Sequence, residues 1–435
     1  MAEKHGVNNG KTITLSFVRF KSTNPQPGYP IVYLAGGPGG SGIDAARGKR
    51  FPLFMALRKV ADVIALDQRG TGASNAIRPC SYKPFPLEEP RTRSTTIAYF
   101  KTAEKHCVAA WQKQGIDLAA YNTREIALDL NTLRKALGVK KLNLWGISYG
   151  STVALGALKL IPKHIDRVVL ASPVATYQMV RLPERTQAFL ERVDALIKAS
   201  PKYAAVYPDL LGTMKTVLDS LARKPAKVTL KDTPDANPVT LRVGSFAVKG
   251  FTKSLLKDPS RLRSLPADYY ALAARFQAVW QPSYSSLTEP EVFTGMPLAV
   301  RATSCLSPAR AKLVERQAKR TLLGNVLNFD TMLVRIRIAN VTPLHGDFCK
   351  PVNSDVPTLI LTGTLDGRTY PAGHAEILQG LSNGNEVVIE NAGHDLFMSS
   401  PKVTVDIVEF LNHQPVKYST IQVPPPDFVV PAPSK

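Results

Sequence analysis

The sequence predicts an α/β protein in which helices cover both faces of a doubly wound, mostly parallel sheet. Short apolar runs that are typical of buried strands recur along the chain, and segments with helical spacing of apolar residues separate several of them. The chain has 435 residues, which is long for a single domain, and 44% of them are hydrophobic, which is ample for a large core. We therefore expect one core domain that carries a sizeable insertion.

Seven segments have the pattern of strands. The first, 12–20, alternates apolar and polar residues as an edge strand does, and the next two, 31–34 and 63–66, are short and apolar throughout. Four more short apolar runs follow later in the chain, at residues 142–145, 167–170, 358–361 and 386–389.

The alternation of strands and helices stops between about Val174 and Asp355. This segment is mostly helical in pattern, for example over 185–199 and 269–279, and it separates one apparent core strand from the next. We interpret it as a helical cap inserted over the carboxyl edge of the sheet. The predicted domains are a core of residues 1–173 and 356–413, a cap of residues 174–355, and a Pro-rich C-terminal tail of residues 414–435 whose sequence from 422 onward is extended rather than an element.

A serine between two glycines follows the apolar run 142–145. The sequence Gly146-Ile-Ser148-Tyr-Gly150 fits a sharp turn from a strand into a helix, which strains its central residue and leaves room only for small flanking residues. Helical patterns over 122–138 and 151–161 place the serine in that context. A chance motif, or a helix N-terminus that favours Ser and Gly, is the alternative. The order of strand, turn and helix favours Ser148 as a nucleophile.

A nucleophilic serine requires a histidine base. Among seven histidines, His394 follows the apolar run 386–389 and precedes a helical pattern over 403–411, so we expect it in a loop at the carboxyl edge of the sheet. A capping or solvent-exposed role is the alternative. His374 lies in a helical segment and His345 in the insertion, and both are expected to be structural.

The carboxylate that orients this base is predicted to be Asp366. An apolar strand from Leu359 runs into a turn and delivers Asp366 to the same edge of the sheet as His394. Asp355 precedes this strand and would lie at its opposite end. Asp395 is too close in sequence to His394 to orient its far nitrogen.

Two backbone amides are predicted to form an oxyanion hole for the negative charge that develops on a carbonyl oxygen. One belongs to Tyr149, directly after the nucleophile, and the other to Gly37 in the glycine-rich loop 35–42. Such a loop could instead bind phosphate. It has neither the Gly-x-Gly-x-x-Gly spacing nor a Lys-Ser/Thr ending, so the oxyanion role is preferred.

Five motifs occur in order along the chain: GGPG at 36–39, DQRGTG at 67–72, GISYG at 146–150, GTLD at 363–366 and GH at 393–394. Together they resemble the proline iminopeptidase and tripeptidyl aminopeptidase group of α/β-hydrolases. The chain order Ser148, Asp366, His394 is also that of the α/β-hydrolases. The resemblance spans about residues 12–412 and implies the α/β-hydrolase fold, a serine exopeptidase activity, often exported, and a helical cap that limits access.

Two positions depart from this group. Ala35 stands where the group usually has a histidine before its GGPG motif, and the expected Asp-x-x-Thr-Pro appears as Asp366-Gly-Arg-Thr-Tyr-Pro371, displaced by one residue. In relatives, acidic cap residues bind the amino terminus of the substrate, but none can be transferred to this cap, so the substrate-binding residues are unassigned. The acidic candidates include Glu184, Glu191, Glu289, Glu291 and Glu315.

The four cysteines, Cys80, Cys107, Cys305 and Cys349, lack the Cys-x-x-Cys spacing of a zinc or thioredoxin-type site. Their even number, with one pair early in the chain and one in the insertion, favours disulfides between Cys80 and Cys107 and between Cys305 and Cys349. Four inert thiols in a cytosolic enzyme are the alternative. Disulfides indicate a periplasmic or secreted protein, whose leader is not present in this chain.

The formal net charge of +21 would attract anions, including nucleic acid. The basic residues are spread along the chain and no nucleic-acid-binding motif is present, so we expect no nucleic-acid partner. No apolar run approaches the roughly 20 residues of a membrane span. No cluster has metal-ligand spacing and serine acyl transfer needs no cofactor, so none is expected. The sequence does not indicate an oligomeric state.

These observations predict a serine hydrolase that acts through an acyl-enzyme on a small-molecule or short peptide substrate. Aminopeptidase-like cleavage of short peptides or aminoacyl amides is the leading hypothesis, and hydrolysis of esters or lactones by the same triad is the alternative. Lys and Arg outnumber acids across the insertion, which favours an uncharged or anionic substrate, whereas the resemblance favours a free amino terminus. A silent binding protein on the same fold would not need a complete triad.

Overall fold

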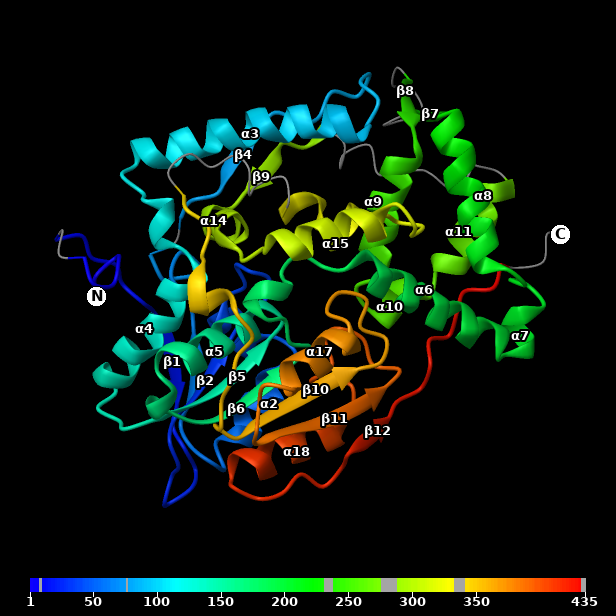
Figure 1. Cartoon of the computed structure of the whole chain (residues 1–435). Coiled ribbons are helices and arrows are strands. Elements are labelled where there is room, and N and C mark those ends of the chain that lie inside the picture. Colours follow the sequence, from blue (N-terminus) through cyan, green and yellow to red (C-terminus); the bar gives the residue numbers. More distant parts are fainter. Residues whose placement is uncertain (8–9, 76, 231–237, 275–287, 332–340, 432–435) are drawn as a thin grey trace.

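An eight-stranded sheet forms the centre of the molecule (Figure 1). The computed structural model describes residues 1–7, 10–75, 77–230, 238–274, 288–331 and 341–431. Within these residues the strand order of the sheet is β1-β3-β2-β5-β6-β10-β11-β12, with β1 antiparallel to β3 and all other neighbours parallel. The strands are β1 (Phe17–Phe20), β2 (Ile31–Leu34), β3 (Val63–Leu66), β5 (Leu142–Ile147), β6 (Ile165–Ala171), β10 (Thr358–Gly363), β11 (Gly384–Glu390) and β12 (Thr420–Gln422).

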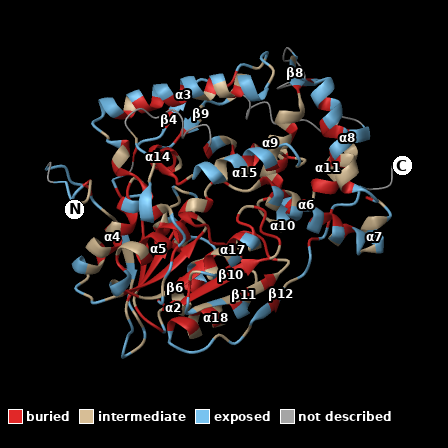
Figure 2. Ribbon diagram, in the orientation of Figure 1, coloured by how far each residue is buried: buried red, intermediate tan, exposed pale blue. Residues whose placement is uncertain are grey.

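Alternate residues of the central strands pack into two hydrophobic cores on opposite faces of the sheet. In β2, Ile31 and Tyr33 belong to one core, and Val32 and Leu34 belong to the other. The buried strands stand out in Figure 2. Because both faces are covered, the strand sequences are apolar throughout rather than alternating. The covering helices include α1 (Gly42–Arg47), α2 (Phe51–Leu57) and α18 (Pro401–Leu411) on one face, and α4 (Thr123–Ala136), α5 (Tyr149–Leu160) and α17 (Pro371–Leu378) on the other.

The predicted fold class is confirmed, and each of the seven predicted strands has a counterpart in the sheet. The predicted edge strand 12–20 is shorter than expected and covers only Phe17–Phe20. The predicted helix 269–279 corresponds to α11, whose described part ends at Ala274, and residues 275–279 lie outside the described residues.

The prediction that residues 414–435 form an extended tail omitted one strand of the sheet. β12 pairs parallel with β11 and extends the sheet by one edge strand. Only Ile421 of this three-residue strand is buried, and prolines follow it closely, so the sequence has no periodic pattern that would reveal it.

The chain between β6 and β10 folds around a third hydrophobic core, whose described residues include buried side chains of the five helices α6, α8, α9, α10 and α11 and of the antiparallel strands β7 and β8. In Figure 1 these elements lie above and to the right of the sheet. The elements of this segment are α6 (Pro183–Lys198), α7 (Pro201–Ala204), α8 (Leu210–Arg223), β7 (Ala226–Leu230), β8 (Val239–Val243), α9 (Ser245–Leu255), α10 (Pro259–Leu262), α11 (Leu265–Ala274), β9 (Glu291–Phe293), α14 (Gly295–Thr303) and α15 (Pro308–Ala318).

A second excursion from the sheet precedes β5. β4 (Cys80–Tyr82) pairs antiparallel with β9 of the insertion, and α3 (Arg93–Lys113) crosses the top of the molecule in Figure 1, away from the sheet. Phe100 of α3 contacts the rings of Phe293 and Phe329. Residues 80–113 therefore lie against the insertion, although about sixty residues separate the two segments in the chain.

Each of these two excursions contains one disulfide. Cys80 is bonded to Cys107, which joins β4 to α3, and Cys305 is bonded to Cys349, with Cα–Cα distances of 5.6 Å and 5.5 Å. The pairing is the predicted one, and no described cysteine is free.

Candidate active site

Ser148 occupies a strained turn between β5 and α5. Its backbone has φ 53° and ψ −123°, a conformation that costs energy in a residue with a side chain. The flanking glycines are required by close approach: a Cβ on Gly150 would lie 2.0 Å from the carbonyl oxygen of Leu34, and one on Gly146 would lie 2.8 Å from the backbone of Gly150. The turn holds the half-buried Ser148 at the wall of a cavity.

His394 and Asp366 are in hydrogen-bond contact. Nδ1 of His394 lies 3.1 Å and 3.0 Å from the two carboxylate oxygens of Asp366. Asp366 follows β10 and His394 follows β11, and both are buried. Because Nδ1 faces the carboxylate, Nε2 is the nitrogen left to act as a base. The neighbouring carboxylate of Asp395 forms ion pairs with Lys49 and Arg50.

Asp366 is stabilised as a carboxylate. Burial alone would raise its pKa, but the charge and hydrogen bond of His394 outweigh burial and hold the pKa well below the ordinary value. The backbone N–H groups of Arg368 and Thr369 donate to Oδ1 at 2.8 Å and 2.9 Å. An ionised carboxylate in this position fixes the tautomer of the imidazole.

Two hydroxyl groups that sequence reasoning missed support this pair. The Thr369 hydroxyl lies 2.7 Å from Oδ2 of Asp366 and 3.0 Å from the carbonyl oxygen of Ser172. Ser172 has φ 46° directly after β6, and its hydroxyl donates to the carbonyl oxygen of His394 at 2.9 Å. The position of Ser172 at the carboxyl end of a predicted strand was the available signal, because such ends meet at one edge of the sheet.

The predicted oxyanion-hole residues line the same cavity as Ser148. Gly37 has φ 119°, which favours glycine, and Tyr149 is the first residue of α5. The loop that carries Gly37 is held by the DQRG segment: Gln68 donates to the carbonyl oxygen of Ala35 at 2.8 Å, and Asp67 accepts from the Ser41 hydroxyl at 2.7 Å. These contacts explain why two motifs far apart in sequence occur together.

The cavity at Ser148 has a volume of about 90 Å³ and is strongly basic. Five basic side chains line it, and Asp330 is the single carboxylate among its described lining residues. None of the five glutamates proposed from the sequence to bind an ammonium group lines it. The basic residues are Arg181, Lys253, Lys257, Arg301 and Arg368.

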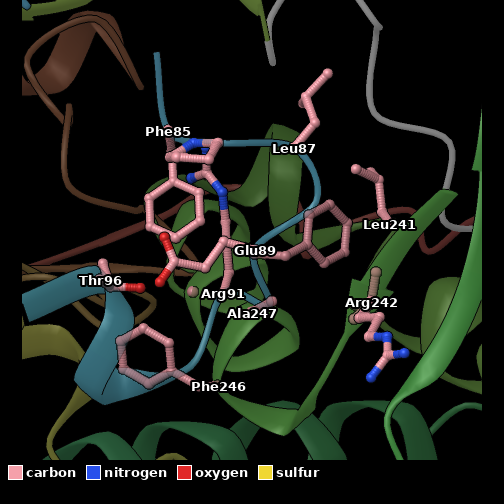
Figure 3. A pocket seen from close by; sticks show the side chains of 13 residues that line it. Phe85, Leu87, Glu89, Arg91, Thr96, Leu241, Arg242, Phe246 and Ala247 are labelled. Carbon is pink, nitrogen blue, oxygen red and sulfur yellow. The ribbon is translucent and has the colours of Figure 1, made fainter. Parts of the chain in front are cut away.

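A larger, apolar cavity of about 310 Å³ lies between the segment 85–96 and the segment 241–251. Figure 3 shows the rings of Phe85 and Phe246 on the left of this cavity and the side chains of Leu87 and Leu241 on the right. It contains none of the predicted catalytic residues, so we assign the candidate active site to the smaller cavity.

Two further features bear on the predictions for partners. Among the described His, Cys, Asp and Glu residues, no group of three could hold a metal ion. None of the helices in the described part of the chain is long and apolar enough to cross a membrane.

A mostly parallel sheet covered by helices, with a serine in a strained turn after β5 and an aspartate and a histidine after β10 and β11, defines the α/β-hydrolase class. The chain belongs to the alpha/beta hydrolase fold family, whose model matches residues 29–401.

Two relatives are peptidases. The chain is 31% identical to the tripeptidyl aminopeptidase of Streptomyces lividans over 180 residues, which are 38% of this chain and 32% of the relative. It is 28% identical to the serine protease Hip1 of Mycobacterium tuberculosis over 176 residues, 38% of this chain and 33% of the relative. The matched part therefore spans about a third of the length of these curated relatives.

Among solved structures, a thermophilic esterase from Thermogutta terrifontis aligns with 92% of this chain and 94% of its own, at 16% identity and a TM-score of 0.40. This similarity is too low to support an inference about activity.

Proposed function

We propose that the protein is a serine hydrolase in which Ser148, His394 and Asp366 form an acyl-enzyme and then hydrolyse it. The observation that carries this proposal is the contact of the buried Asp366 carboxylate with Nδ1 of His394, at the same sheet edge as the strained Ser148 turn. This contact leaves the far nitrogen of His394 to accept a proton, as a base must.

In the proposed mechanism, Oγ of Ser148 attacks the substrate carbonyl carbon while Nε2 of His394 takes the hydroxyl proton. Asp366 stabilises the imidazolium that forms, and the backbone amides of Gly37 and Tyr149 donate to the oxyanion. His394 then gives its proton to the leaving group as the bond to it breaks. A water molecule, deprotonated by His394, attacks the acyl-enzyme and releases Ser148.

Aminopeptidase-like cleavage of short peptides or aminoacyl amides is the leading assignment, and the peptidase relatives support it. Hydrolysis of esters or lactones is the second candidate. A specific observation favours it: an ammonium group requires carboxylates, and Asp330 is the single one among the described lining residues of the cavity.

The same proposal gives a role to the insertion and a location to the protein. We infer that residues 174–355, with the excursion 80–113, form a cap that limits access to Ser148, because Lys253, Arg301 and Leu327 of the insertion line the same cavity as Ser148. The two disulfides support a periplasmic or secreted location.

The test is labelling with a neutral fluorophosphonate probe, followed by a panel of aminoacyl, peptidyl and acyl-ester chromogenic substrates. Wild type should be labelled at Ser148, and Ser148→Ala should lose labelling and roughly four to six orders of magnitude in turnover, because the nucleophile is gone. Folded wild-type protein that never reacts with the probe or the panel would refute the proposal.

A further inference from the structure

We propose that the cavity at Ser148 selects substrates that carry a carboxylate close to the carbonyl under attack. This inference rests on the proposed serine hydrolase function and names its substrate class. Because it disfavours a free ammonium group on the substrate, it argues against the aminopeptidase assignment and not against the serine hydrolase chemistry. It starts from the lining of the cavity, where five basic side chains surround a volume of about 90 Å³ that also contains Ser148 and the oxyanion-hole residues. A carboxylate bound there would lie within a short distance of the reacting carbonyl.

The basic side chains come from widely separated parts of the chain and converge on one space. Arg181 precedes α6, Lys253 lies on α9, Lys257 follows α9, Arg301 lies on α14 and Arg368 follows β10. All five are half-buried rather than fully solvated. A general excess of basic residues does not require such convergence, because most surface lysines and arginines point to solvent.

Among the described residues that line the cavity, carboxylates balance this charge only in part. Nζ of Lys253 lies 2.7 Å from Oδ2 of Asp330, whose side chain is 50% exposed. Burial would raise the pKa of Asp330, but Lys253, Arg301 and Arg181 together lower it below the ordinary value, so this group is anionic at neutral pH. Nε of Arg181 donates instead to a neutral acceptor, the carbonyl oxygen of Arg368, at 2.6 Å.

Lys257 lies close to other positive charges. Burial lowers the pKa of this side chain, and the positive charges of its neighbours lower the pKa further, against a smaller opposing effect of Asp258. The neighbours responsible are Arg368, Arg261 and Lys253. A carboxylate in the cavity would relieve this repulsion by pairing with the basic side chains.

The charge of the cavity favours an anionic group on the substrate and disfavours a free ammonium group. A cationic substrate would add a further positive charge to five existing ones. Acyl groups that end in a carboxylate, such as the N-succinyl group of a blocked amino acid, satisfy both conditions.

Three matched substrates test the inference: the p-nitroanilides of N-succinyl-alanine, N-acetyl-alanine and alanine itself, each also prepared as the p-nitrophenyl ester. They share the scissile bond and differ in carrying an anionic, neutral or cationic group. We expect kcat/KM for the succinyl compound to exceed that for the acetyl compound by about tenfold or more at low salt, and this ratio to fall as NaCl is raised. The free amine should be the poorest.

Charge variants locate the effect. Lys257→Gln and Arg301→Gln should each lower the succinyl-to-acetyl ratio several-fold, whereas Lys249→Gln, on α9 but outside the cavity lining, should leave the ratio unchanged. Two independent variants are used in case one fails to fold. The wild-type ratio tests the inference even if both fail.

The outcomes separate this inference from the proposed function. Equal kcat/KM for the succinyl and acetyl compounds, or a preference for the free amine, in protein whose Ser148 reacts with the neutral fluorophosphonate would overturn the inference and leave the serine hydrolase intact. Absence of labelling would instead overturn the proposed function. Succinate and inorganic phosphate are then compared as protectants of Ser148 against the probe: stronger protection by succinate supports a carboxylate, and stronger protection by phosphate overturns that choice.

Discussion

At the scale of single residues, the hydroxyl of Thr369 links three parts of the candidate site. It lies 2.7 Å from Oδ2 of Asp366, 3.0 Å from the carbonyl oxygen of Ser172 and 3.4 Å from Nδ1 of His394. Thr369 touches none of the reacting atoms in the proposed mechanism. We expect it to position the Asp366 carboxylate, which orients the base in the proposed mechanism.

Thr369→Val should therefore lower kcat roughly 10- to 100-fold with little change in KM, because a misplaced base slows the chemical step without removing contacts to substrate. Thr369→Ser retains the hydroxyl and should restore most of the lost kcat. Steady-state kinetics on one chromogenic substrate measures both. An increase in KM at constant kcat would contradict a positioning role.

A second residue, His374, should make stability depend on pH. It is buried in α17 with Nδ1 2.9 Å from the Thr362 hydroxyl, and burial lowers its pKa to about 4. In the unfolded chain the ordinary value is about 6.5, so between these values the unfolded state binds a proton that the folded state does not. The contribution of His374 to stability is therefore complete above pH 6.5 and is lost as pH falls toward 4.

This difference in the pKa of His374 between the folded and unfolded states corresponds to roughly 3 kcal/mol of the free energy of unfolding, which is lost between about pH 6.5 and pH 4. Urea unfolding at pH 7 and pH 4.5 should show a smaller loss of stability on acidification in His374→Gln than in wild type. His345→Gln, which replaces an exposed histidine, serves as the control and should behave like wild type. Equal acid sensitivity in His374→Gln and wild type would contradict the prediction.

At the scale of elements, a buried ion pair joins the chain after β3 to helix α4. Nε of Arg69 lies 2.7 Å from Oδ2 of Asp129, and both side chains are almost fully buried. The same guanidinium donates to the carbonyl oxygen of Ala120 at 2.7 Å, and His5 near the N-terminus contacts Asp129 at 2.8 Å. The arginine of the DQRG motif is therefore structural, although it lies next to residues that shape the site.

Arg69→Met should lower the free energy of unfolding by about 3 to 5 kcal/mol, because it leaves the Asp129 carboxylate buried without its main partner. Arg124→Met is the matched control: this arginine is 48% exposed and contacts Glu125 at 3.4 Å, so its loss should cost less than about 1 kcal/mol. Chemical denaturation of both variants measures the two losses in the free energy of unfolding. Similar losses in the two would show that burial does not govern this pair.

The sequence allowed prediction of the elements whose signal is local. The apolar runs predicted the core strands, the Gly-x-Ser-x-Gly spacing predicted the turn at Ser148, and pairwise grouping predicted the disulfides. Features that depend on contacts between distant segments were missed. The pairing of β4 with β9 and the convergence of basic side chains on one cavity leave no pattern within a window of sequence. The assignment of Ser148, Asp366 and His394 to catalysis stays a prediction.

At the scale of the whole molecule, the C-terminal segment connects the sheet to the insertion. After β12 joins the sheet edge, Phe428 is buried in the third hydrophobic core, and the N–H of Val429 donates to the carbonyl oxygen of Arg263 at 2.9 Å. The ring of Phe428 contacts Tyr203 with centroids 5.3 Å apart. The tail therefore holds the insertion to the core in addition to the two covalent connections of the chain at β6 and β10.

Phe428→Ala should lower the stability of the insertion by about 3 kcal/mol or more, because it removes a buried ring and leaves a cavity. The effect should be local, since the sheet retains β12, so limited proteolysis should cut the insertion of the variant earlier than the core. Val430→Ala, two residues away and 38% exposed in wild type, is the control and should be cut at the wild-type rate. If Phe428→Ala and Val430→Ala were cut at equal rates, or if Phe428→Ala were cut first in the core, the tail would not hold the insertion in place. A faster cut confined to the insertion would mean that the segment after β12 helps to keep the proposed cap over Ser148.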